Sequence, residues 1–114
     1  MRIELPFPPT TNHLYITRGR FRVLSPEARE YKAEVLKRCQ IARMRPLEYN
    51  VGVHINVYRP RKVGDLDNTL KAIFDALKGS AWHDDKQVIE IHAFRHDDKK
   101  NPRAIVETID LGRD

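Results

Sequence analysis

The stretch GDLDNTLKAIFDALKG, residues 64–79, fixes the start, the end and the buried face of one helix. Its apolar residues recur at the spacing i, i+3, i+4, i+7 that marks one helical face: Leu70, Ile73, Phe74 and Leu77. Gly79 is a natural helix stop. The stretch therefore predicts a helix over 67–78, preceded by two acidic residues where an extended segment turns into it.

Period-2 patterns on both sides of this helix predict strands. Residues 51–59 alternate apolar and polar side chains, as a strand with one buried face does. Further strands are expected over 87–95 and 103–110, after the helix. Upstream, short strands are expected over these ranges: 2–5, 14–17 and 20–24.

A second long helix is predicted over 26–43. Ser25 can cap it, and Pro26 suits its first helical position. The order of elements predicts an α+β fold in which two main helices accompany a mixed or antiparallel sheet. The 114 residues suit a single domain, residues 1–114, with one real core.

Composition narrows the class of protein. Lys and Arg number 21 against 16 Asp and Glu, which gives a net charge of +5 and fits either a polyanionic partner or an ordinary solvated basic surface. Cys39 is the only cysteine, so intramolecular disulfides and cysteine-based zinc sites are excluded. No apolar run matches a signal peptide or a membrane span, and no GxxxxGK[ST] loop exists for a nucleotide cofactor. A cytoplasmic protein is expected.

Two acid pairs carry the strongest chemical signal. Asp65 and Asp67 flank the helix start, and Asp84 and Asp85 follow the loop after the helix. Carboxylates brought together repel one another unless a cation holds them, and Mg²⁺ prefers such oxygen ligands. The simpler alternatives are an aspartate helix cap for the first pair and an ordinary acidic turn for the second.

Two further side chains near the acid pairs are candidates. Lys71 lies one turn beyond Asp67, where it could stabilise a phosphoryl-transfer transition state or merely form a surface ion pair. His83 adjoins Asp84 and is the one histidine worth testing as a neighbour of the site.

The chain resembles the RusA family of Holliday-junction resolvases. The resemblance rests on DLDNTLKAIFDAL (65–77), on WHDDKQV (82–88) and on the Pro-rich opening LPFPPTTN (5–12). It implies a small homodimeric endonuclease of DNA recombination and repair, often of phage or prophage origin. Such an enzyme cuts four-way DNA junctions by paired symmetric nicks and needs Mg²⁺, for which Mn²⁺ can substitute.

The resemblance also implies roles for individual residues. Asp65, Asp67 and Asp85 would be the catalytic metal ligands and Lys71 the active-site lysine, with Asp84 as a neighbouring acid. Family members can carry a longer arginine run before the first acid pair, whereas Val63-Gly64 stand there in this chain. We therefore expect DNA contacts from other basic residues: Arg59, Arg61 and Lys62 before the acid pair, or Arg18, Arg20 and Arg22 in the hairpin.

Two other functions fit the sequence. A non-catalytic nucleic-acid-binding protein would explain the basic loops but not the acid pairs, since carboxylates repel phosphate. A metal-dependent nuclease for flaps or other branched DNA would need aromatic stacking platforms, for which four side chains are candidates: Phe7, Tyr15, Tyr58 and Trp82.

Overall fold

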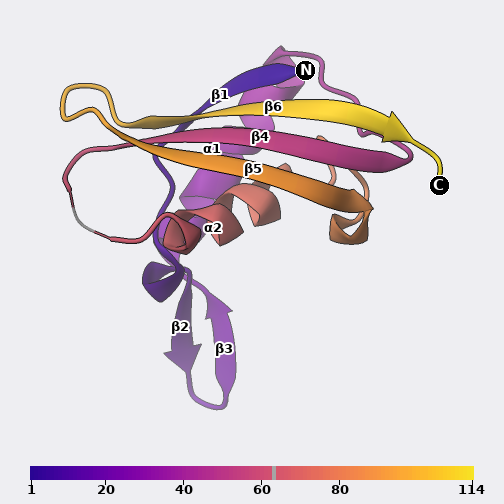
Figure 1. The fold of residues 1–114 in the computed structure, drawn as a ribbon. Coiled ribbons are helices and arrows are strands. Elements are labelled where there is room, and N and C mark those ends of the chain that lie inside the picture. The colour runs from indigo at the N-terminus through magenta and orange to yellow at the C-terminus, as the bar shows by residue number, and fades with distance from the viewer. Residues whose placement is uncertain (63) are drawn as a thin grey trace.

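A four-stranded sheet forms one layer of the computed structural model, which describes residues 1–62 and 64–114 (Figure 1). Its strands lie in the order β1-β6-β4-β5, so the central β4 has a partner on each side. β5 runs parallel to β4, and the other neighbouring strands are antiparallel. Their bounds are β1 (Arg2–Pro6), β4 (Asn50–Arg59), β5 (Val88–Asp97) and β6 (Arg103–Gly112). The expected mixed sheet is confirmed.

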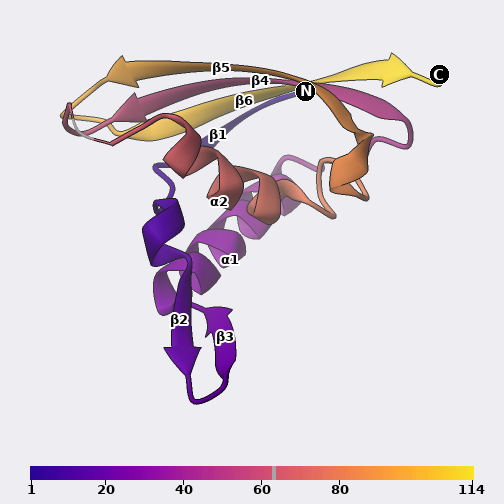
Figure 2. The ribbon, with the colours of Figure 1, turned by 60° about the horizontal axis from the view of Figure 1, so that its bottom comes forward.

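Both helices lie on one side of this sheet, as Figure 2 shows: α1 (Pro26–Ile41) and α2 (Asp67–Leu77). α1 begins as its sequence predicts, because the Ser25 hydroxyl accepts a hydrogen bond from the backbone N–H of Ala28, 3.0 Å away. The same hydroxyl donates to the His13 carbonyl at 2.6 Å. The cap therefore also ties the helix start to the segment before the hairpin.

The core lies between β4 and the helices. Val53, Ile55 and Val57 on β4 are fully or almost fully buried. They face the same layer as Ile73 and Leu77 of α2, which belong to the apolar stripe read from the sequence. The predicted buried faces of β4 and α2 are therefore those that form the core.

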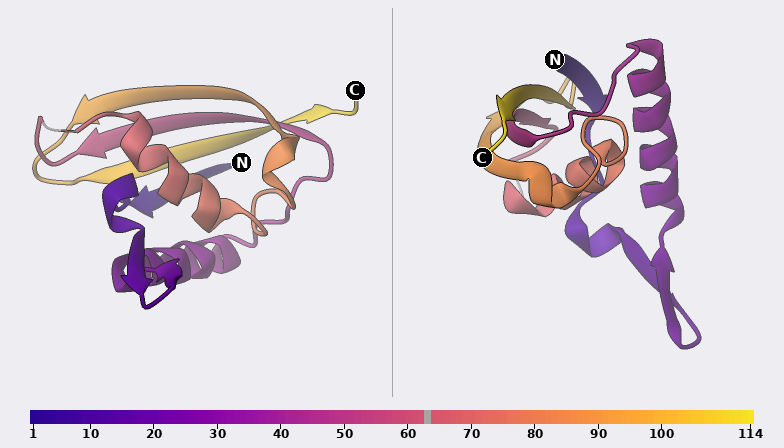
Figure 3. Two further views of the ribbon diagram at one scale, coloured as in Figure 1. Left: turned by 90° about the horizontal axis from the view of Figure 1, so that it is seen from below. Right: turned by 90° about the vertical axis from the view of Figure 1, so that its right-hand side faces the viewer.

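The chain between β4 and β5 makes a crossover through α2. A parallel pair of strands needs such a crossover, because its second strand must start at the same end as the first. The crossover places the start of α2 near the end of β4, and the short helix η2 (Asp85–Gln87) leads into β5 (Figure 3). Both acid pairs therefore lie on the connection between the two parallel strands.

A separate hairpin, β2 (Tyr15–Arg18) and β3 (Phe21–Leu24), projects from the body of the molecule (Figure 1). Gly19 sits at its turn with φ +61°, a conformation that glycine adopts readily. The Thr11 hydroxyl at the base of the hairpin donates to the Asn68 carbonyl in the first turn of α2, at 3.1 Å. The arginine-bearing hairpin is thus connected to the helix end that carries the first acid pair.

Cys39, the only cysteine of the sequence, is buried on α1, and burial raises the pKa of its thiol. Among the described residues, no helix has the length and apolarity needed to cross a membrane.

Candidate active site

Asp65 and Asp67 lie exposed at the start of α2. Leu66 occupies the N-cap position, and no side chain caps the helix there. Within residues 1–62 and 64–114, neither the Asp65 nor the Asp67 carboxylate has a hydrogen bond or an ion pair. The capping alternative is therefore not supported, and both carboxylates are available to a ligand from solvent.

Asp84 has a local structural role. Its carboxylate accepts the backbone N–H of Lys86 at 3.1 Å, and the Gln87 side chain accepts the backbone N–H of Asp84 at 2.8 Å. This capping box starts η2. The hydrogen bond from Lys86, chiefly, holds the pKa of Asp84 below its usual range. The acidic-turn reading therefore accounts for Asp84, which shapes the segment that presents Asp85.

Asp85 is oriented by a buried tryptophan. The indole Nε1–H of Trp82 donates to Asp85 Oδ1 at 2.9 Å. Trp82 is 0% exposed, and its ring lies against Phe74 of α2 with the ring centroids 5.7 Å apart. A rigid donor beneath the surface thus fixes one carboxylate oxygen of an otherwise exposed residue.

Lys71 and Asp85 line one hollow between α2 and the start of β5. The remaining lining residues are Phe74, Asp75, Val88 and Ile91. Lys71 Nζ lies 3.5 Å from Asp75 Oδ2, at i,i+4 spacing, and both side chains are partly exposed. Such a pair is weak in water, so the ammonium can exchange this partner for a phosphate.

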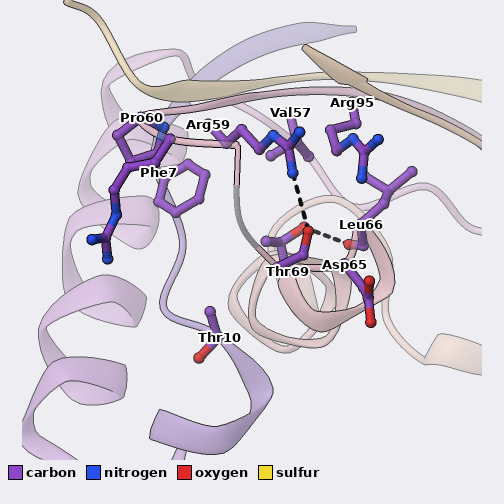
Figure 4. A pocket seen from close by; sticks show the side chains of 11 residues that line it. Phe7, Thr10, Val57, Arg59, Pro60, Asp65, Leu66, Thr69 and Arg95 are labelled. Atoms are coloured by element: carbon purple, nitrogen blue, oxygen red, sulfur yellow. Dashed lines mark hydrogen bonds between the residues drawn. The ribbon is translucent and has the colours of Figure 1, made fainter. Parts of the chain in front are cut away.

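Asp65 lies by a second hollow, at the end of β4 (Figure 4). Arg59, Arg61 and Arg95 also line it, and Figure 4 shows the Asp65 carboxylate directed away from the guanidinium groups of Arg59 and Arg95. Arg95 was missed by the sequence analysis because a single arginine in a strand carries no motif. Its only signal is its place near the end of β5, the strand that pairs with β4.

The donor chemistry suits Mg²⁺, since Asp65, Asp67 and Asp85 offer exposed carboxylate oxygens. In the part of the chain that the structure describes, however, no three His, Cys, Asp or Glu side chains lie close enough together to hold one ion. Asp65 and Asp85 line different hollows. The expected convergence of the three aspartates is thus not seen within a single chain.

The basic candidates for DNA contacts are of two kinds. Arg59 already has partners within the chain, whereas the others are exposed to solvent. Arg59 is 12% exposed, ion-paired with Asp97, and donates to the Gly64 carbonyl at 3.1 Å. Its hydrogen bond holds the pKa of Asp97 below the usual range. Arg59 therefore stabilises the loop before α2, and its guanidinium is largely occupied by contacts within the chain rather than available to DNA. Exposed basic residues remain in that loop and on the hairpin: Arg61, Lys62, Arg18, Arg20 and Arg22. Val63, part of the shortened basic run, lies outside the described residues.

His83 does not turn toward the acid pair. Its Nε2 lies 3.1 Å from Glu48 Oε1, a residue 35 positions earlier in the chain. Its backbone N–H donates to Gln87 at 2.8 Å, within the same capping network as Asp84. The contacts of His83 are therefore structural ones at the start of β5.

Comparison with known proteins gives a consistent picture over the whole chain. The family model described as Endodeoxyribonuclease RusA matches residues 6–109. Crossover junction endodeoxyribonuclease RusA of Escherichia coli (strain K12) is 34% identical over 98% of this chain and 96% of its own length. The protein of the same name from Enterobacteria phage 82 is 33% identical over 98% of this chain and 96% of its own length. The matched segment includes the hairpin, both acid pairs and Lys71, so the chain belongs to the RusA family of endodeoxyribonucleases.

Proposed function

We propose that this protein is a Mg²⁺-dependent endonuclease that resolves four-way DNA junctions by paired symmetric nicks and acts as a homodimer. The observation that carries the proposal is that the Asp65 and Asp67 carboxylates at the start of α2 have no partner among residues 1–62 and 64–114, with Lys71 one turn on. Family membership supports it, since the relatives are named crossover junction endodeoxyribonucleases. A nuclease of cellular or phage DNA would act in the cytoplasm.

The metal would be held by Asp65, Asp67 and Asp85. Bound there, Mg²⁺ or Mn²⁺ would supply an activated water and shield the phosphate charge. The protein's own contribution is to keep these carboxylates ionised and exposed and to fix Asp85 through the Trp82 N–H. For all three to bind one ion, they have to lie closer together than in this structure.

Lys71 would act on the phosphate rather than on the metal. Its ammonium lies on the same hollow as Asp85 and forms an ion pair with the partly exposed Asp75. A cation at that place offsets the negative charge that grows on the phosphoryl oxygens in the transition state.

DNA would be drawn to the site by the excess of basic side chains. The net charge of +5 favours a polyanion, and the exposed arginines of the hairpin are anchored to the start of α2 through Thr11. The bound ion would also cancel the repulsion between the carboxylates and the DNA phosphates, which argues against a non-catalytic binder.

A nuclease for flaps or single strands finds little support in the aromatic residues. Trp82 is fully buried, so no base can stack on it. The rings of Tyr15 and Tyr58 are already covered by guanidinium groups, those of Arg22 and Arg103. Phe7 is half-buried beside the Asp65 hollow. Trp82 is therefore inaccessible, and the rings of Tyr15 and Tyr58 are occupied.

The function is tested by cleavage of a fixed four-way junction in Mg²⁺, in Mn²⁺ and in EDTA. We expect nicks at symmetric positions on two strands of like polarity with either metal, and no nicks in EDTA. A flap and a linear duplex at the same ionic strength serve as controls, since salt alone changes DNA affinity. Equal cutting of all three substrates, or cutting that survives EDTA, would contradict the proposal.

Trp82→Phe tests how Asp85 is positioned. The change keeps an aromatic ring in the core but removes the N–H that donates to Asp85. We expect the cleavage rate at limiting Mg²⁺ to fall by about 10- to 100-fold, as for other outer-shell partners of metal ligands. Raising the Mg²⁺ concentration should restore much of the rate.

A matched core variant separates this effect from a loss of stability. Val35→Ala, in α1, also removes volume from a buried position but lies outside the residues assigned to the site. If Trp82→Phe and Val35→Ala show the same Mg²⁺ dependence as the parent protein, Trp82 does not position Asp85.

A further inference from the structure

β5 is a long edge strand, and its pairing with β4 is regular from Glu90 onward, after a register shift between Val88 and Glu90. It has ten residues and no proline, and it exposes three large apolar side chains: Ile89 (56%), Ile91 (51%) and Phe94 (51%). Natural sheets blunt such an edge because its free N–H and C=O groups can pair with another chain. Within the described residues, no side chain hydrogen-bonds to the β5 backbone.

The opposite edge of the sheet is protected. β1 has five residues and ends at Pro6. The Arg38 side chain of α1 donates to the Glu4 carbonyl at 3.0 Å, and the Tyr31 hydroxyl donates to the Pro6 carbonyl at 3.0 Å. A short strand, a proline and covering side chains are the ordinary means of closing an edge. β5 lacks these features, which points to a strand that another chain covers.

The sequence of β5 is complementary to itself when two copies run antiparallel and are centred on Ile91. Opposite residues then lie on the same face of the sheet, and each copy sees the same partner. Ile91 meets Ile91 of the partner, within the part of β5 whose pairing with β4 is regular, from Glu90 onward. The central apolar side chains of the exposed edge thus face one another.

Polar residues also match in this register. Glu90 lies opposite His92 of the partner, which can donate an imidazole N–H to the carboxylate. Moving the centre by one residue to His92 places Glu90 opposite Phe94 of the partner. The register centred on Ile91 pairs this apolar residue with its own copy and gives the acid a donor, so the pattern favours it over the one centred on His92.

The uncovered face of the sheet is a poorer surface for a second copy. It exposes Ile109 and Leu111, but ion pairs cross it between Arg2 and Glu107 and between Arg103 and Glu4. Burying these charges against another sheet would cost their hydration without new partners.

We propose that two copies of this chain join through β5, antiparallel and centred on Ile91, so that one sheet continues through both subunits. The inference rests on the proposed homodimer and says where its interface lies. A two-fold axis perpendicular to the sheet keeps the helices of both subunits on one side. Because Ile91 also lines the hollow of Lys71 and Asp85, the two candidate active sites would open on that same side, next to the axis.

Disulfide cross-linking tests both the surface and the register. The native Cys39 is buried, so the parent protein serves as the control that has no surface cysteine to cross-link. Ile91→Cys should form a covalent dimer under mild oxidation, reversed by dithiothreitol, on the order of tenfold faster than the parent, because opposed residues approach disulfide distance. Ile89→Cys and Ala93→Cys are matched controls on the same strand. Each lies roughly 13 Å from its own copy in this register, four residues along a strand, and should form few covalent homodimers.

The oligomeric state supplies a second measurement. Ile91→Lys should weaken dimerisation by roughly 100-fold in analytical ultracentrifugation, since it places two charges at the centre of the interface. Ile109→Lys, on the uncovered face, should leave the dimer unchanged, and circular dichroism checks that both variants fold.

The results that would overturn the proposed interface differ from those that would overturn the proposed function. Ile91→Cys cross-linking no faster than Ile89→Cys, or fast homodimers of Ala93→Cys, would overturn the register. A dimer broken by Ile109→Lys but not by Ile91→Lys would place the interface on the uncovered face. In either case junction cleavage by the parent protein would still support the proposed function, whereas loss of cleavage by a normal dimer would refute the function alone.

Discussion

Asp67→Asn is expected to abolish cleavage of a four-way junction while leaving junction binding intact. Asn keeps the size of the side chain but removes the negative charge that a hard cation needs. The single-turnover rate should fall by roughly three orders of magnitude, the scale at which a bound ion lowers such barriers. Affinity for the junction in EDTA should stay equal or rise, because one repulsive carboxylate is gone.

The control for this prediction is Asp110→Asn, which makes the same chemical change on β6. Asp110 is exposed and accepts the backbone N–H of Gly112 at 2.9 Å, a bond that Asn can also accept. It should cleave like the parent protein, which separates the loss of a ligand from a general change of charge. Normal nicking by Asp67→Asn in Mg²⁺ would remove Asp67 from the site, since no described residue pairs with its side chain and could explain an indirect role.

Local signals in the sequence located most elements of the fold. The expected helix over 26–43 is observed as Pro26–Ile41, and that over 67–78 as Asp67–Leu77. Caps and apolar periodicity act within a few residues, so one sequence contains enough information to place them. The strand order β1-β6-β4-β5 could not be predicted from the sequence, because it depends on pairings between segments far apart in the chain.

The same limit explains the differences within the site. Arg59 looked like a DNA contact, but Asp97, 38 residues away, holds it. His83 looked like a neighbour of Asp84, but it contacts Glu48. Both partners come from the far side of a crossover, which no spacing rule reveals. Lys71 and Asp85 share a hollow for the same reason, since α2 and the start of β5 are brought together only by the parallel pairing of β5 with β4.

In β5, the alternation of the sequence predicts a buried face that the single chain does not bury. Its alternation correctly indicated a strand, although its register with β4 shifts at Ile89, between Val88 and Glu90. Alternation normally implies that one face is buried, yet Ile89 and Ile91 are both exposed in the single chain. In the proposed dimer, β5 of a second copy covers this edge. The apolar pattern of β5 thus reflects a contact that a single chain cannot make.

Lys71→Ala is expected to lower kcat for junction cleavage by about 100- to 1,000-fold, the usual cost of removing one group that stabilises transition-state charge. Junction affinity should change little, because the protein has many other basic side chains and one cation is a small part of the total. Folding should be unaffected, since the one ion pair lost among the described residues is the partly exposed pair with Asp75, and alanine favours helix.

Two companion variants decide what Lys71 does. Lys71→Arg keeps the charge and should recover part of kcat, whereas loss of a mere packing contact would not be rescued in this way. Lys37→Ala removes an exposed lysine from the other helix and should cleave normally. If Lys71→Ala weakens binding and leaves kcat unchanged, the ammonium anchors a phosphate in the ground state, and transition-state stabilisation must come from the metal and its carboxylates alone.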